Sequence, residues 1–146
     1  MSSGQTYAGD VPAYEESRAI LKEAPVRVIA CDSAALVKNN DAGAIIITGS
    51  HGGVLAGRPR YGIAAQARGA VFNDAGVGID QAGIKRLEIL ERAGVPAVTV
   101  DAATARIGDA RSAWKSGVVS HRNALAEDRG VVIGASVPEF VEMFSS

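Results

Sequence analysis

Four short apolar segments recur along the chain and alternate with amphipathic or polar stretches. Ala42–Thr48 is an uninterrupted apolar run rich in β-branched residues. A run of this kind is typical of a strand that is buried on both faces of a parallel sheet. The four segments are therefore predicted to be strands: Val26–Cys31, Ala42–Thr48, Ala70–Asn73 and Pro96–Val100.

The stretches after the strands carry helix signals. The clearest helix is expected to begin at Asp80 and to run to about Ala93, with apolar residues on one face and charged residues, Arg86 among them, mostly outside. Ser136 and Glu139 have the spacing of a capping box, which predicts a last helix over Val137–Phe144.

Weaker signals complete the expected order of elements. Further helices are expected over Tyr14–Glu23, Ser33–Lys38, Ile63–Arg68 and from Ser120 to about Arg129, with a short edge strand at Val131–Ile133. Asp101–Gly117 is interpreted as a loop with a helical turn. The alternation predicts an α/β fold: a single three-layer domain with a mostly parallel sheet of four to five strands.

Composition agrees with one globular domain. The chain has 146 residues, of which 47% are hydrophobic. Residues 1–9 are small and polar and are expected to form a flexible N-terminal arm, with residues 10–146 as the single α/β domain. The net charge of −1 gives no reason to expect a nucleic-acid partner.

The apolar runs are strand-sized, so no membrane partner is expected. The first ten residues lack the basic and apolar regions of a secretory signal, which favours a cytoplasmic protein. Small α/β domains commonly build sites between subunits, and we expect a homo-oligomer. Cys31 is the only cysteine, and it is interpreted as a buried small side chain, with a nucleophile as the alternative.

Each predicted strand ends in polar residues. The exits are Asp32, Ser50–His51, Asn73–Asp74 and Asp101. If the strands are parallel, these groups meet at one edge of the sheet, where open α/β sheets bind ligands. The competing interpretation is that Asp, Asn, Ser and Gly are simply the residues that turns require.

The segment Ser50-His51-Gly52-Gly53 is the strongest single signal. Consecutive glycines allow backbone N–H groups to approach an oxyanion closely. The segment resembles the His-Gly-Gly oxyanion segment of lipases and esterases, but their Gly-x-Ser-x-Gly motif is absent, so membership of that family is not assigned. His51 is expected to act as an acid or base, with a turn histidine as the alternative.

Cofactor motifs fail in this sequence. Asn73–Gly78 resembles the dinucleotide-binding fingerprint, but its third glycine, Gly83, comes too late, and too little chain follows Ala70 for a dinucleotide domain. Gly52 and Gly57 have Walker A spacing without the lysine. No cofactor and no metal are therefore expected, although a Mg²⁺ site on Asp32, Asp74 and Asp101 stays open as an alternative.

Arginine predominates among the cations. The chain has 11 Arg against 4 Lys, and residues 42–73 contain no Asp or Glu. Because Arg binds carboxylate and phosphate with a two-pronged fork, a small anionic metabolite is the expected partner. Arg106 and Arg58 are the candidates for holding it, and solvated surface arginines are the competing interpretation.

Together these observations predict an enzyme of hydrolase or isomerase/lyase type that acts on a small anionic metabolite. The alternative is a non-catalytic anion-binding or assembly protein. The predicted catalytic residues are His51, Asp74 and Ser50, and the predicted substrate-binding residues are Gly52, Gly53, Asn73, Arg106, Arg58 and Asp101.

Overall fold

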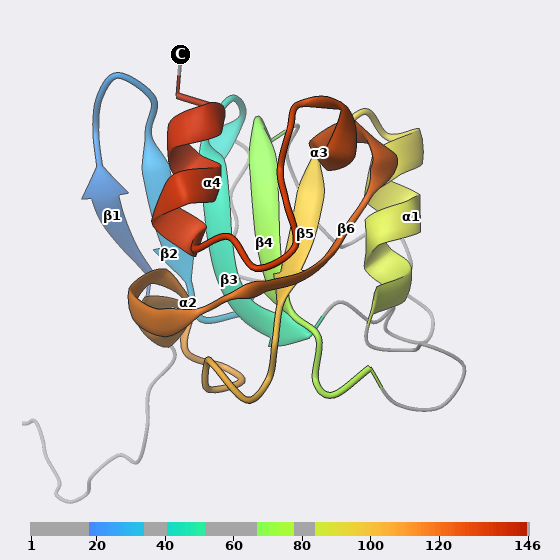
Figure 1. The fold of residues 1–146 in the computed structure, drawn as a ribbon. Helices are drawn as coiled ribbons and strands as arrows, with labels where there is room; N and C mark the ends of the chain where they lie inside the picture. Colours follow the sequence, from blue (N-terminus) through green and yellow to red (C-terminus); the bar gives the residue numbers. More distant parts are fainter. Residues whose placement is uncertain (1–17, 34–40, 52–66, 78–83, 146) are drawn as a thin grey trace, which may run out of the picture.

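The protein has an α/β fold with a single mixed sheet (Figure 1). A computed structural model describes residues 18–33, 41–51, 67–77 and 84–145. Within these ranges the sheet has six strands in the order β1-β2-β3-β4-β5-β6, and four helices accompany it. The strands are β1 Arg18–Lys22, β2 Val28–Cys31, β3 Ile45–His51, β4 Gly69–Asn73, β5 Ala97–Val100 and β6 Val119–Arg122; the helices are α1 Lys85–Arg92, α2 Ala110–Ser116, α3 Ala124–Asp128 and α4 Val137–Met143.

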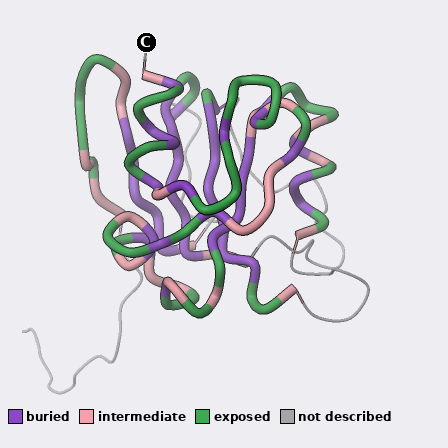
Figure 2. The backbone as a smooth tube through the Cα atoms, viewed as in Figure 1, coloured by how far each residue is buried: buried purple, intermediate pink, exposed green. Residues whose placement is uncertain are grey.

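The four strands that the apolar runs predict are all present as β2 to β5. These four strands pair in parallel with one another, and their apolar residues are buried on both faces of the sheet (Figure 2). The expectation of four to five mostly parallel strands is only partly right, because two antiparallel strands, β1 and β6, extend the sheet at its edges.

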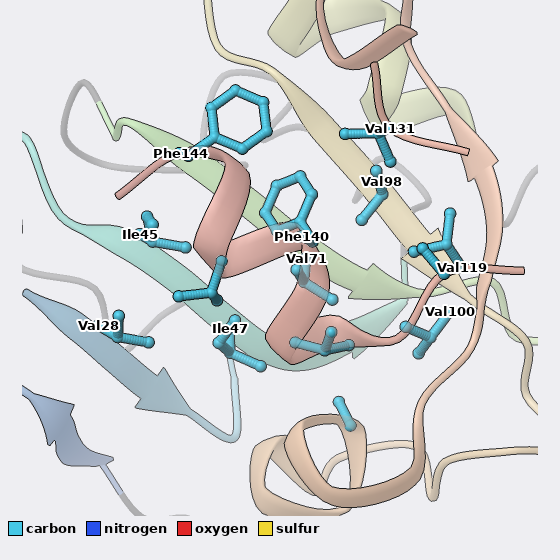
Figure 3. Packing of buried hydrophobic residues seen from close by; sticks show 14 of the residues in the cluster. Val28, Ile45, Ile47, Val71, Val98, Val100, Val119, Val131, Phe140 and Phe144 are labelled. Atoms are coloured by element: carbon cyan, nitrogen blue, oxygen red, sulfur yellow. The ribbon is translucent and has the colours of Figure 1, made fainter. Parts of the chain in front are cut away.

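Two hydrophobic clusters cover the two faces of the sheet. Phe72 and Ala97 pack with Leu87 and Leu90 of α1 on one face, which we call the α1 face. On the other face, side chains of α2, α3 and α4 pack on the alternate residues of the same strands (Figure 3). The sheet therefore lies between α1 and the remaining three helices.

Aromatic packing ties α4 to the middle of the sheet. The rings of Phe140 and Phe144 lie 4.9 Å apart, and both are fully buried over β3 and β4 (Figure 3). A Cβ atom on Gly69 would be 3.1 Å from the Phe140 ring, so the glycine makes room for it. The capping box predicted for this helix is present, with Glu139 N donating to Ser136 Oγ and Ser136 N donating to Glu139 Oε1.

The first predicted helix is wrong where the structure describes it. Residues 18–22 form strand β1 rather than the end of a helix over Tyr14–Glu23, whose first four residues lie outside the described ranges. Arg18 donates two hydrogen bonds of 2.7 Å to the buried carboxylate of Asp41, which lies 23 residues away. A contact between residues so distant in sequence overrides local helix propensity.

The predicted helix from Ser120 to Arg129 is also wrong in its first half. Residues 119–122 form β6, and a shorter helix, α3, begins after Asn123. Asn123 is buried, and its amide accepts hydrogen bonds from Ala126 N and Ala97 N while it donates to two carbonyls, those of Leu87 and Val95. This asparagine therefore caps α3 and joins it to β5 and α1.

Other boundaries differ less. Val131–Ile133 forms no strand; instead Val131 N donates to Ala126 O and ends α3. Helix α1 begins at Lys85, and its predicted cap, Asp80, lies outside the described residues. The predicted N-terminal arm, residues 1–9, also lies outside them, as do residues 34–38 and 63–66 of two predicted helices. The segment 101–117 is a loop followed by α2, as expected. Among the described residues, no helix has the length and apolar character that crossing a bilayer requires.

Candidate functional site

The carboxyl ends of the parallel strands do meet at one edge of the sheet, as their register requires. There Asp32 and Asn73 are buried and hold the loop that follows β5. Ala110 N donates to Asp32 Oδ1 over 2.9 Å, and Asn73 Nδ2 donates to Ala105 O over 3.0 Å. These two polar exits therefore position the loop and the start of α2, a structural role that acts through long-range bonds and not through local turn chemistry.

Gly49 lies within strand β3. Its carbonyl accepts a hydrogen bond of 2.7 Å from Gly108 N, and a Cβ atom at this position would lie 2.2 Å from Asp109 N. The absence of a side chain thus lets the loop after β5 cross the strand directly.

The predicted oxyanion segment falls largely outside the described residues. Ser50 and His51 are the last residues of β3, and His51 is the register partner of Asn73. Ser50 is half-buried. Gly52, Gly53 and Arg58 lie outside the described residues, so their proposed roles stay predictions.

Asp101 and Arg106 lie at the same edge but are exposed. The carboxylate of Asp101 accepts Ala103 N and closes a local turn, and the backbone N–H of Arg106 donates to Ser112 Oγ. Within the described ranges neither side chain contacts Asp74. These two residues are therefore not brought into contact with the predicted catalytic carboxylate.

Asp74 is the predicted residue around which a polar cluster forms. Its side chain is 6% exposed. Oδ1 accepts hydrogen bonds from the backbone of Gly76 and Ala102, and Oδ2 accepts one of 2.7 Å from Ser120 Oγ. The carboxylate is thus held rigidly, with one oxygen directed at β6.

A β-bulge brings the rest of the cluster together. In the pairing of β5 with β6, Thr99 is opposite His121 and Val100 is opposite Val119, so Ser120 is an extra residue. Consecutive residues of a regular strand point to opposite faces. Here Ser120 Oγ and His121 Nδ1 both lie near Thr99 Oγ1, at 3.0 and 3.3 Å, because the bulge turns them toward one side.

The hydrogen bonds indicate how the imidazole is oriented. His121 Nδ1 lies 3.2 Å from Ser120 Oγ and 4.0 Å from Asp74 Oδ2. Ser120 Oγ donates to Asp74 Oδ2, so its oxygen is free to accept a hydrogen bond from Nδ1–H; Thr99 Oγ1, 3.3 Å from Nδ1, can either accept from it or donate to it. When the neutral ring carries its proton on Nδ1, Nε2 is the acceptor.

A pocket opens beside this cluster. It has a volume of about 640 Å³, within the range of small-molecule sites, and lies between α1 and β6. Ser120 and His121 line it together with charged residues of α1, among them Lys85, Glu88 and Glu91. The His121 side chain is 37% exposed, so the ring can reach a molecule bound there.

Arg86 of α1 is a cation whose side chain is buried. It was expected on the outer face of its helix, but it is 4% exposed and lies on the α1 face, with its guanidinium 5.0 Å from the centre of the Phe72 ring. Burial lowers the pKa of Arg86. Its Nη1 atom is buried and has no hydrogen-bond partner among the residues that the structure describes, which is rare for a charged group.

Cys31 is fully buried, as the sequence analysis expected. Burial raises the pKa of its thiol, and the hydrogen bond from Arg18 Nη1 to Sγ offsets this only in part. We predict that an aromatic disulfide reagent at pH 8 labels Cys31 at least about a hundredfold more slowly in the native protein than in urea, because the thiol is both inaccessible and protonated. Equal rates would contradict the buried position.

The described residues hold no group of three or more His, Cys, Asp or Glu side chains arranged to bind a metal ion. Comparisons of the chain with protein-family models, with curated proteins and with solved structures found no match. The chemistry must therefore be argued from the site alone.

Sequence reasoning missed three members of the site. Ser120 was expected to begin a helix, His121 was placed inside that helix, and Arg86 was expected on the outer face of its helix. The β-branched pair Val118–Val119 after a glycine is a strand signal that could have placed Ser120 and His121 on β6. Arg86 was expected outside because its side chain is charged, although the residues one turn further along the helix, Ile89 and Leu90, are apolar.

Proposed function

We propose that the protein is an enzyme in which His121 Nε2 transfers a proton to or from a small anionic molecule bound between α1 and β6. The observation that carries this proposal is the chain of contacts from His121 Nδ1 through Ser120 Oγ to the buried carboxylate of Asp74. A carboxylate that orients an imidazole and favours one tautomer is a common arrangement of acid–base catalysis.

The proposed reaction is a proton transfer of isomerase or lyase type, or hydrolysis by an activated water. In the first case the lone pair of Nε2 takes a proton from a carbon beside a carbonyl or carboxylate group. The bonding electrons move onto that group. In an isomerisation the imidazolium returns its proton to another carbon; in an elimination the electrons return to form a C=C bond, the bond from the next carbon to the leaving group breaks, and the imidazolium protonates the departing group. The Asp74 charge, relayed through Ser120, stabilises the imidazolium while it holds the proton.

The roles of the sequence-predicted residues change in this proposal. Asp74 keeps its expected role as an orienting acid, whereas His121 replaces His51 as the acid–base group. Ser50 and His51 end their strand at the same edge of the sheet, and Gly52, Gly53 and Arg58 stay proposed contributors to anion binding.

We predict that His121→Gln lowers turnover by about a hundredfold or more, because the proton acceptor is lost. The measurement is deuterium incorporation from D₂O into a panel of small carboxylates and phosphates, followed by NMR. Glu142→Gln, an exposed change on α4, is the control and is expected to retain full turnover.

A His51→Gln variant distinguishes the two histidines. Loss of turnover in His51→Gln together with full turnover in His121→Gln would overturn the proposal. Binding of a panel member without turnover would favour the non-catalytic alternative. As an independent readout, ¹⁵N NMR of the neutral His121 ring is expected to show the proton on Nδ1, and Ser120→Ala is expected to shift it toward Nε2.

A further inference from the structure

Arg86 is a buried cation that lacks an anionic partner within the described chain. Removing an arginine from water costs several kcal/mol unless a counter-charge or hydrogen bonds compensate for it. The contact with the Phe72 ring, at 5.0 Å, compensates only in part. The guanidinium has five N–H donors, and no described residue offers an acceptor to the buried Nη1.

The surroundings of Arg86 connect it with the His121 cluster. Phe72, on which the guanidinium lies, is the register partner of Thr99, and Thr99 Oγ1 is 3.3 Å from His121 Nδ1. Register partners on neighbouring strands point to the same face of a sheet. Arg86 and His121 therefore both lie on the α1 face, roughly 10 Å apart if two strand spacings separate them.

The first turn of α1 carries two cations and one acid: Lys85 and Arg86 precede Glu88, whose carboxylate pairs with Arg92. Lys85 lines the pocket beside His121, whereas Arg86 is not among the residues that line it. The N-cap residue of the helix, Ile84, offers no side-chain cap to the amides of the first turn. These amides and the two cations favour a negatively charged group at this end of the helix.

We infer that Arg86, next to the lining residue Lys85, binds a carboxylate or phosphate group of the substrate. The reaction in which Arg86 would take part rests on the proposed function, whereas the binding of an anion by Arg86 does not. A planar guanidinium binds either group with two parallel hydrogen bonds, which Lys85 alone cannot reproduce. Arg86 thereby takes the role that the sequence analysis gave to Arg106 and Arg58.

The test is thermal unfolding with inorganic phosphate and, separately, succinate, each against chloride at equal ionic strength. At ten times its Kd, either anion is expected to raise the Tm of the wild type by about 4 °C. In Arg86→Met this shift is expected to vanish, with binding weakened by about thirtyfold or more. The matched control is Arg92→Met, on the exposed face of the same helix, which should keep the full shift.

The Tm without added anion provides a second readout. Because methionine removes an uncompensated buried charge, Arg86→Met is expected to be at least as stable as the wild type in chloride. Should Arg86→Met fail to fold, Arg86→Lys serves instead: it keeps the charge but loses the fork, and it should weaken anion binding by about tenfold. An anion shift that persists in the Arg86 variants, or one absent from the wild type with both anions, would overturn the inference.

The two anions distinguish the chemical source, because a larger shift with phosphate indicates a phosphate ester and one with succinate indicates a carboxylic acid. His121→Gln separates this inference from the proposed function. It should lose turnover but keep the Arg86-dependent shift. If His121→Gln keeps both its turnover and the anion-dependent rise in Tm, only the proposed function fails. If His121→Gln loses turnover and neither Arg86 variant changes the rise in Tm, only the role of Arg86 fails.

Discussion

Replacing Gly49 by alanine is expected to destabilise the protein by about 4 kcal/mol or more. Few single substitutions cost this much, and those that do disrupt the core severely. The new Cβ would lie 2.2 Å from Asp109 N and 2.5 Å from the carbonyl carbon of Gly108. Both are backbone atoms, so no side chain can rotate away. The loop would have to withdraw, which breaks the bond from Gly108 N to Gly49 O.

The damage should extend beyond the point of contact. The same loop leads into α2, whose start is held by Asp32 and capped by Asp109. The free energy of unfolding measured by urea denaturation gives the loss directly. Because natural domains are stable by only about 5 to 15 kcal/mol, the variant is expected to be partly unfolded at 37 °C.

Gly134→Ala is the matched control for this prediction. Gly134 has a positive φ of 98° and no atom within 4 Å of a built Cβ, so alanine there meets only backbone strain, about 1 kcal/mol. If Gly49→Ala costs no more than Gly134→Ala, the loop after β5 can move away freely and its close approach to β3 is not needed for stability.

Arg18→Met is expected to cost about 3 to 5 kcal/mol, because it leaves a buried charge without its counter-ion. The Asp41 side chain is 0% exposed, and both its oxygens accept hydrogen bonds of 2.7 Å from the guanidinium. The pair also joins the edge strand β1 to the chain just before β3. Urea denaturation again measures the loss.

A double variant separates the buried charge from other effects. Arg18→Met with Asp41→Leu removes both charges, and we expect it to be more stable than Arg18→Met alone. Arg92→Met is the control for an exposed ion pair, since Arg92 and Glu88 are both 73% exposed, and its loss should stay below about 1 kcal/mol. A double variant as unstable as Arg18→Met would show that packing, not charge, is what Arg18 supplies.

The sequence predicted well wherever a local pattern carries the physical cause. Strands β2 to β5 are runs of apolar, β-branched residues because both faces of the sheet are covered. The last helix was predicted from Ser136 and Glu139, whose capping bonds span only three residues. Asp74 could be selected for the same reason, since it directly follows a buried strand.

The failures occur where a contact distant in sequence decides the outcome. Residues 18–22 form a strand because they pair with the edge of β2, and residues 119–122 form one because they pair with the edge of β5. The bulge at Ser120 depends on a register that no local pattern specifies. The close approach of the loop after β5 to Gly49 joins residues 60 positions apart, so no local pattern predicts it.

The sequence by itself determined the α/β class, the four central strands, and a set of polar groups at their carboxyl ends. Only the tertiary structure decided which of these groups form a site. Asp32 and Asn73 are engaged in holding a loop, whereas Asp74 meets Ser120 and His121 from an unpredicted strand. The physical reason is that hydrophobic periodicity is a property of neighbouring residues, whereas the pairing of buried charges depends on packing between segments that lie far apart in the chain.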